Sequence, residues 1–411
     1  MNIFLVFILG SLLFFYALGV FVDALNVRAI RKTIPQEFAG FLSKERYARS
    51  QSYLKENTAF GIITNTFDTF VLIVFILIGG FNFLDKFARN FGFNEIITGL
   101  IFIFSLSLLS KIVSLPFSIY QTFVIEHRYG FNKTTPKTFV LDLIKGLILQ
   151  LIIGGVVFAI VLFLFQSFHS VAWILAWITV ALVQLFLVFI APIVIMPIFN
   201  KFTPLEEGKL RQEIEKFAQS QNFKLGGIFT IDSSKRSTKS NAFFTGIGKY
   251  KRIALYDTLI KNHTTQELVS ILAHEIGHYK LGHIKKLIAI SILSIGVTFY
   301  LFSLLINNQI LFAAFKMEHL SIYASLVFAS VLYSPFGTIS GFVVNSISRK
   351  FEYEADQFAV KEYKKPKTFI ESLKKLSADN LSNLTPHKLY VILNYSHPTV
   401  LQRIRRIRQT Y

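Results

Sequence analysis

Long apolar stretches constrain this 411-residue chain more than any other feature. Seven of them can cross about 30 Å of hydrocarbon as helices. Of all residues, 53% are hydrophobic and 16% are charged, whereas a typical soluble protein has about 25% charged residues. This composition predicts a mainly α-helical membrane protein and excludes disordered and fibrous classes. The seven expected spans cover roughly residues 3–24, 60–83, 97–125, 139–166, 171–199, 287–308 and 323–346.

Basic residues predict the orientation of these spans, because cytosolic loops of membrane proteins carry most of the Lys and Arg. Nearly all basic residues outside the spans lie in the loops after the first and third spans, in segment 200–286 and in the tail 347–411. The intervening loops hold only Lys86, Arg89 and Lys316. With seven spans, this pattern predicts an N-terminus outside and a C-terminus in the cytosol.

The net charge of +19 comes from the same loops, and we expect a basic surface that faces water and the lipid bilayer. No nucleic-acid-binding motif accompanies it, so we expect no nucleic-acid partner. The chain has no cysteine, which excludes disulfides and thiolate metal ligands. We expect the first apolar stretch to be a retained span, because it lacks the basic start of a signal peptide and its apolar run is too long.

The segments outside the spans predict one cytosolic α+β domain. An amphipathic helical pattern covers about 204–221, and a strand-like run begins near Ile228. Asn241–Thr245 and Arg252–Tyr256 flank a glycine-containing turn, which predicts a small β-hairpin. The expected organisation is therefore five transmembrane helices in 1–199, a cytosolic segment in 200–286, helices six and seven in 287–346 and a cytosolic tail in 347–411.

A metal-binding motif, His274-Glu275-Ile276-Gly277-His278, lies in a helical pattern that we expect to continue into the sixth span. Residues four apart share one helix face, so both imidazoles can bind one zinc ion while Glu275 acts as general base. On a continuous helix His283 lies about 140° around from His278, so we expect only a local polar contact from it. Two packed histidines without metal would fit the motif equally well, and a third ligand has to decide.

The third ligand is predicted to be Glu352. The chain crosses the membrane twice between His278 and Glu352, so both residues return to the same side. Asp356 follows four residues later on the same helix face and can hydrogen-bond a ligand imidazole. Viewed alone, this segment would be a solvated charged helix, but the matched topology favours a His, His, Glu site with one Zn²⁺ per chain.

Several segments resemble the type I CAAX prenyl endopeptidases, a family of seven-span zinc metalloproteases. The resemblance rests on the motif at 274–278, the segment from Ser348 to Asp356 and Ser396-His397-Pro398. Residues 126–132, 197–204, 240–244 and 251–258 are also similar, so the resemblance covers nearly the whole chain. One departure is Lys239, where the family pattern has histidine.

The resemblance implies a barrel of helices around a water-filled chamber and roles for two further residues. His397 is expected to stabilise the oxyanion, and Arg403 to act as a substrate-binding or supporting cation. On spacing alone, His397 would be an ordinary loop residue and Arg403 part of a solvated basic face. The strand at Asn241–Thr245 is a candidate edge for pairing with an extended substrate, with Asn241 as its contact.

We therefore expect a membrane-embedded zinc endopeptidase that cleaves membrane-associated peptides or proteins, including C-terminally prenylated CAAX substrates. One alternative is a bacterial quality-control protease without prenyl specificity. A metal-binding transporter and a metal-stabilised structural protein are alternatives from other classes, but neither explains Glu275 beside the first ligand. The many Ile, Phe and Lys residues favour a bacterial inner membrane, and a eukaryotic source would imply the endoplasmic reticulum membrane.

Overall fold

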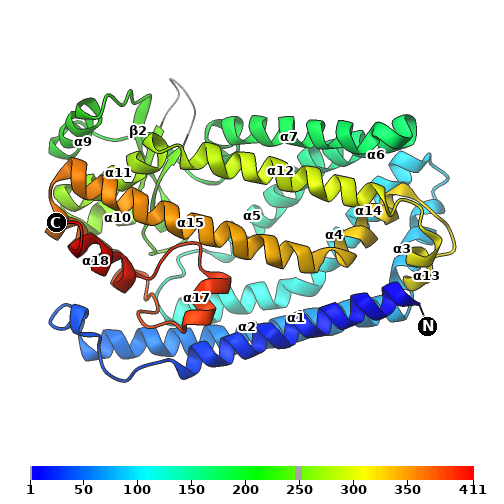
Figure 1. Cartoon of the computed structure of the whole chain (residues 1–411), viewed down its shortest axis with the longest axis horizontal. Coiled ribbons are helices and arrows are strands. Elements are labelled where there is room, and N and C mark those ends of the chain that lie inside the picture. The colour runs from blue at the N-terminus through cyan, green and yellow to red at the C-terminus, as the bar shows by residue number, and fades with distance from the viewer. Residues whose placement is uncertain (1, 246–251) are drawn as a thin grey trace.

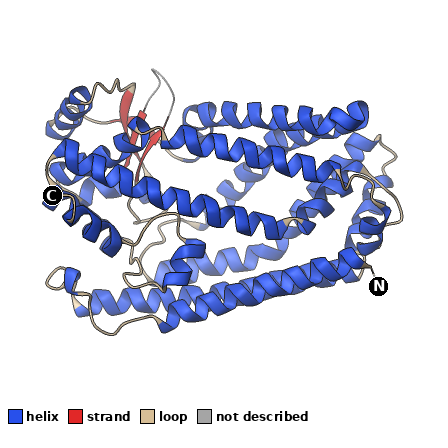
Figure 2. Cartoon of the chain, in the orientation of Figure 1, coloured by secondary structure: helices blue, strands red, loops and turns tan. Residues whose placement is uncertain are grey.

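The computed structural model describes residues 2–245 and 252–411. Most helices run along the long axis of the molecule, and a small sheet lies at one end (Figures 1 and 2). The C-terminus lies at the end that holds the sheet, and the N-terminus lies at the opposite end. We call these the sheet end and the far end.

Apolar helices form the body of the molecule. Within the described residues, five helical stretches are long and apolar enough to cross a membrane, or six if one bent pair counts as a single span. Large apolar side chains such as Phe14, Ile63 and Phe70 are exposed on them, as expected of helices that face lipid. The first three stretches and the fifth are α1 (Ile3–Arg28), α2 (Lys44–Leu77), α4 (Glu95–Tyr120) with the π-helical η2 (Gln121–Glu126), and α12 (His283–Ser303).

The fourth and longest stretch is Pro136–Phe199, and the chain reverses direction in its middle, between α6 and α7 (Figure 1). The backbone of His169 has φ +39°, which cannot continue a right-handed helix. The helices on either side, α6 and α7, pack against each other. The elements in order are α5 (Pro136–Leu149), η3 (Gln150–Gly154), α6 (Gly155–Phe168), η4 (His169–Val171), α7 (Ala172–Ile190), η5 (Ala191–Ile195) and α8 (Met196–Phe199).

The last apolar stretch is bent, whereas the sequence predicts an unbroken span at 323–346. Helices α14 (Ile322–Leu332) and α15 (Ser334–Tyr363) meet at an angle of 56°. Pro335 lies in the first turn of α15, and a proline there lacks the N–H that would continue the preceding helix. Helix α15 then extends beyond its apolar part and carries Glu352 towards the sheet end.

The sheet has four strands in the order β1-β2-β4-β3. Strands β3 (Ala242–Thr245) and β4 (Arg252–Tyr256) pair antiparallel as the predicted hairpin requires, and residues 246–251 lie outside the described residues. Two pairings go beyond the predicted hairpin. Strand β2 (Gly227–Ile231) is parallel to β4, and β1 (Phe202–Pro204) is antiparallel to β2. Strand β3 is therefore an edge of the sheet.

Helices from both halves of the chain build the core at the sheet end. Besides residues of the sheet, this core includes Phe38 and Tyr47, which come from the first loop and from the start of α2. The side chain of Glu37 accepts from Arg408 at 2.8 Å and pairs with Lys374 at 2.6 Å. The first loop is thus part of this core. The helices here are α9 (Lys209–Ser220), α10 (Asp257–Asn262), α11 (Thr265–Lys280), α16 (Pro366–Asp379), α17 (Lys388–Asn394) and α18 (Val400–Arg408).

The far end contains α3 (Gly80–Arg89), α13 (Gln309–Ala314) and a buried charge cluster. Asp85 is wholly buried and accepts from Arg89 Nε at 2.9 Å. The hydroxyl of Tyr323 on α14 also donates to Asp85. Each carboxylate oxygen of Asp85 is therefore paired, and the bond to Tyr323 connects α3 to α14.

Lys239, the departure from the family pattern, connects the strand segment to the membrane helices. Its Nζ lies 2.9 Å from Glu126 on η2 and 2.9 Å from the hydroxyl of Tyr53 on α2. The same ammonium lies 4.5 Å from the ring centroid of Phe131. Lys239 therefore holds the chain close to α2 and η2 just before β3 begins.

Candidate metal centre

Helix α11, which carries the metal-binding motif, has strong local signals at both ends. Thr264 and Glu267 form a capping box at its start, which satisfies amides that have no partner within the helix. The helix ends at Lys280, and Gly282 has φ +70° before α12 begins at His283. The expected continuous helix is therefore wrong, because a left-handed glycine breaks it.

The turn that carries the second histidine packs closely against α15. A Cβ atom at Gly277 would lie 3.3 Å from the Cα of Ala355 and 3.1 Å from the ring of Phe358. Such distances are tighter than ordinary van der Waals contact, so glycine permits this approach of the two helices. Close packing at Gly277 and Ala355 brings Glu352, one turn earlier on α15, opposite the histidines.

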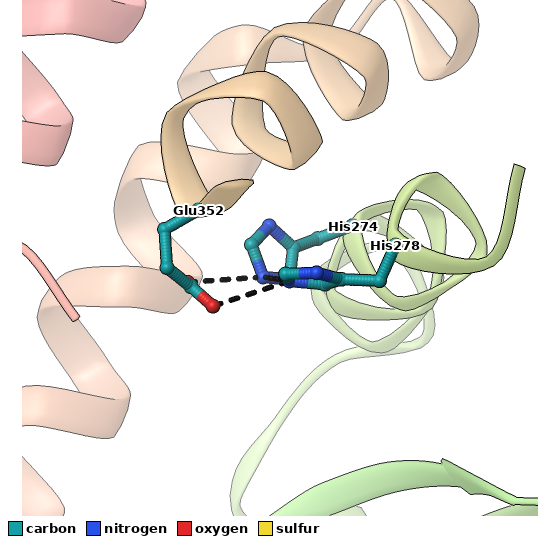
Figure 3. A group of neighbouring side chains, drawn as sticks. All are labelled: His274, His278 and Glu352. Carbon is teal, nitrogen blue, oxygen red and sulfur yellow. Dashed lines mark hydrogen bonds and ion pairs between the residues drawn. The ribbon is translucent and has the colours of Figure 1, made fainter. Parts of the chain in front are cut away.

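The two histidines and Glu352 point toward one another (Figure 3). The Nε2 atoms of His274 and His278 are 3.1 Å apart. Glu352 Oε2 lies 3.4 Å from His274 Nε2, and Glu352 Oε1 lies 3.2 Å from His278 Nε2. A tetrahedral zinc ion with bonds of about 2.0–2.1 Å separates its ligands by about 3.3 Å. These three residues fit a single zinc ion.

The polar atoms around the ligands also match a metal site. Glu352 is buried, and in the described part of the chain its Oε2 has no hydrogen-bond partner, although buried carboxylate oxygens are normally paired. Asp356 Oδ1 lies 2.9 Å from His274 Nδ1, which leaves His274 Nε2 available to a metal. Asp356 also receives a bidentate pair from Arg403, with Nε 2.9 Å from Oδ2 and Nη2 2.6 Å from Oδ1.

The charges around the site perturb the titration of its residues. Burial and Arg403 alone would lower the pKa of His274, but its bonds to Asp356 and Glu352 raise it to about 9. Burial raises the pKa of the Glu275 carboxyl, while the two imidazoles oppose the rise. Burial would lower the pKa of Arg403, yet the carboxylates of Asp356 and Glu352 raise it. The carboxylates thus make this buried pocket favourable for positive charge.

His283 makes a closer contact with the site than we expected from its spacing. Its Nδ1 lies 3.1 Å from His278 Nδ1, and its Nε2 lies 2.9 Å from Glu354 Oε2. The break at Gly282 turns His283 back towards His278. The glycine before His283 is the sequence signal that could have revealed this break.

The other predicted site residues lie at different distances from the ligands. His397 Nε2 is 3.2 Å from Glu352 Oε1, and its side chain is 62% exposed. Arg403 Nη1 is 3.6 Å from Glu352 Oε2, and its side chain is only 13% exposed. Asn241 is exposed just before β3, and its side-chain oxygen accepts from the N–H of Ala242 at 2.9 Å. His397 and Arg403 therefore adjoin the ligands directly, whereas the polar contact of the Asn241 side chain is local.

Two histidines and a glutamate beside a potential base, at one end of a bundle of apolar helices, define a membrane metalloendopeptidase. Comparisons with known families agree. Residues 23–201 match the CAAX prenyl protease N-terminal region, described as five membrane helices, and residues 204–411 match peptidase family M48. The chain belongs to peptidase family M48.

Individual relatives match over nearly the whole chain. A probable CAAX prenyl protease 1 of Schizosaccharomyces pombe is 38% identical over 399 residues, covering 93% of this chain and 83% of the relative. A CAAX prenyl protease 1 homolog of Arabidopsis thaliana is 35% identical, covering 97% and 96%. The crystal structure of S. mikatae Ste24p matches with a TM-score of 0.94 and 30% identity over 99% of both chains.

Proposed function

We propose that this membrane metalloendopeptidase uses one zinc ion to cleave prenylated CAAX proteins. The observation that carries the proposal is the convergence of His274, His278 and Glu352, whose ligand atoms all lie within 4.8 Å of one another. The relatives named CAAX prenyl protease support the substrate class. They favour it over the alternative of general membrane-protein turnover without prenyl specificity.

The mechanism assigns one task to each residue around the ligands. A zinc ion held by the three ligands supplies Lewis acidity towards the scissile carbonyl. Glu275 accepts the proton of the attacking water and passes it to the leaving amine nitrogen, and a raised pKa suits a group that must both take and give a proton. His397 donates a hydrogen bond to the developing oxyanion, for which its exposed ring is accessible.

Arg403 and Asp356 act as a support for the ligands in this proposal. Asp356 is buried, the side chain of Arg403 is 13% exposed, and the two are joined by two hydrogen bonds. Asp356 orients His274, and Arg403 holds Asp356 in place. We favour this supporting role of Arg403 over direct substrate binding, because its side chain is only 13% exposed and two of its three guanidinium nitrogens already donate to Asp356.

The edge of β3 is the proposed binding site for the peptide backbone. Tyr256 N donates to Asn241 O at 3.1 Å, so in this antiparallel pair the backbone groups of Ser240, Ala242 and Phe244 point to the open edge. Asn380 already pairs with both backbone groups of Ser240, at 3.1 and 3.3 Å. A substrate strand would therefore pair from Ala242 onward, once the Asn241 side chain releases the Ala242 N–H.

We further propose seven spans, with the N-terminus outside and the sheet end in the cytosol. The reversal at His169–Val171 supports two spans within Pro136–Phe199, and α14 with α15 counts as one more. The relatives named here are eukaryotic, which favours the endoplasmic reticulum membrane over the bacterial membrane suggested by composition. The unequal distribution of basic loops supports the orientation.

The decisive assay compares a farnesylated CAAX peptide with the same peptide carrying an unmodified cysteine, using purified protein in detergent. Mass spectrometry of the products should show faster cleavage of the farnesylated peptide. A chelator should abolish cleavage and added zinc should restore it. No cleavage of either peptide would contradict the peptidase assignment, and equal rates would support the turnover alternative.

A further inference from the structure

The second ligand, His278, has an orienting partner that is itself a histidine. His283 is wholly buried, and its ring stacks on Phe351 with centroids 4.2 Å apart and planes 4° from parallel. One ring nitrogen faces His278 Nδ1 at 3.1 Å, and the other faces Glu354 Oε2 at 2.9 Å. Because the ring is inaccessible to substrate, any contribution to activity must pass through His278.

The positions of the protons on this chain of groups follow from the proposed metal site. His278 Nε2 faces Glu352 and His274, so it must offer a lone pair to a metal and His278 Nδ1 must carry the proton. That N–H donates to His283 Nδ1. The remaining proton of His283 lies on Nε2 and is donated to Glu354, so each hydrogen bond has one donor and one acceptor.

We propose that His283 and Glu354 are positioning residues that fix the orientation and tautomer of His278 for zinc. This inference rests on the proposed zinc site and extends it. His274 reaches the carboxylate of Asp356 directly, at 2.9 Å, whereas His278 reaches the carboxylate of Glu354 through an intervening imidazole. Helix α15 thereby supplies a metal ligand, Glu352, and the carboxylates that orient both histidines.

The competing explanation is that His283 only fills space against Phe351. His283→Phe separates the two explanations, because it keeps an aromatic ring that can stack but has no ring nitrogen. His283→Gln is the matched variant that keeps an acceptor for His278 and a donor for Glu354. Glu354→Ala and Glu354→Gln form a second pair at a position that is 34% exposed, where loss of folding is less of a concern.

Zinc affinity is the readout, measured by competition with a chelator on the full chain in detergent. His283→Phe and Glu354→Ala should each weaken zinc binding by about 10- to 100-fold. His283→Gln and Glu354→Gln should stay closer to wild type. The double variant of His283→Phe and Glu354→Ala should be no weaker than His283→Phe alone, because both changes interrupt one chain of hydrogen bonds.

Two of the possible outcomes would contradict the positioning role of His283, and a third would contradict the proposed zinc site. Wild-type zinc affinity in His283→Phe would overturn the positioning role and leave the zinc site intact. If His283→Phe does not fold, equal affinities of Glu354→Ala and wild type would overturn it instead. A wild-type chain that binds no zinc would contradict the proposed function itself.

Discussion

The two ends of the molecule both bury charged groups, but the clusters differ in the atom that has no hydrogen-bond partner among the described residues. That atom is a guanidinium nitrogen, Arg89 Nη2, at the far end and a carboxylate oxygen, Glu352 Oε2, at the sheet end. At the far end, both oxygens of Asp85 accept hydrogen bonds, from Arg89 and from Tyr323. At the sheet end, the ligand atoms of His274, His278 and Glu352 lie within 4.8 Å of one another, and Glu352 Oε2 has no hydrogen-bond partner within the described residues. A cluster whose carboxylate oxygens are both paired fastens helices, whereas an unpartnered carboxylate oxygen beside two imidazole nitrogens indicates a bound cation.

The largest expected effect comes from removing two ligands together. His274→Ala combined with His278→Ala should abolish stoichiometric zinc binding and cleavage, because Glu352 alone cannot hold the ion at a tetrahedral site. Elemental analysis of purified protein should give one zinc per wild-type chain and none in the variant. Unchanged zinc content in the variant would show that the sheet-end cluster is not the metal site.

Substitutions in the far-end cluster should lower the stability of the protein without changing its zinc content. Asp85→Ala removes the buried acceptor of Arg89 and Tyr323 and should lower the free energy of unfolding by about 2–3 kcal/mol. Asp85→Asn keeps an acceptor and is the milder control. Thermal unfolding with parallel zinc analysis tests this. Loss of zinc from folded Asp85→Ala would contradict a purely structural role of the far-end cluster.

A smaller effect is expected at the helix contact that brings the ligands together. Gly277→Val inserts atoms where Ala355 and Phe358 already lie close, and overpacking of this kind costs about 1–3 kcal/mol. Zinc affinity should fall as well, because Glu352 moves with α15. Gly146→Val is a matched control in a helix where an added Cβ meets no atom of the described residues within 4 Å. Equal zinc affinity of the two variants would disprove the close-contact argument.

The smallest perturbation locates the two ends relative to the membrane. His319→Cys places a thiol at an exposed far-end position of a chain without cysteine, and Glu206→Cys does the same at the sheet end. Neither change should alter stability measurably. In sealed vesicles, an impermeant reagent should label Glu206→Cys only from the cytosolic side and His319→Cys only from the other side. Reversed labelling would contradict the proposed orientation.

The sequence predicts the proximity of residues where the physical signal is local or follows from the expected topology. The spacing of His274 and His278 predicts one shared helix face, and the two predicted membrane crossings place Glu352 on the same side. In the structure the ligand atoms of the three residues lie within 4.8 Å of one another. The same four-residue spacing identified Asp356, which the structure finds 2.9 Å from His274 Nδ1. These inferences needed only helix periodicity and the count of crossings between the motifs.

Other features depend on contacts between segments that are distant in the sequence, and the periodicity of apolar residues does not predict such contacts. The role of Phe38 and Tyr47 in the sheet-end core, and the parallel pairing of β2 with β4, are of this kind. His283 was misplaced for a different reason. The rotation of about 140° between His278 and His283 holds only on an unbroken helix. Helix α11 ends at Lys280, and the left-handed Gly282 separates it from α12.

The most direct test of the central claim separates catalysis from metal binding at Glu275. Glu275→Gln keeps the shape of the side chain but cannot accept the proton of the attacking water. We predict that it retains one zinc per chain while peptide cleavage falls by about 10²- to 10⁴-fold, whereas Glu352→Gln loses zinc together with activity. Cleavage at the wild-type rate by Glu275→Gln, or equal loss of zinc in both variants, would contradict the account.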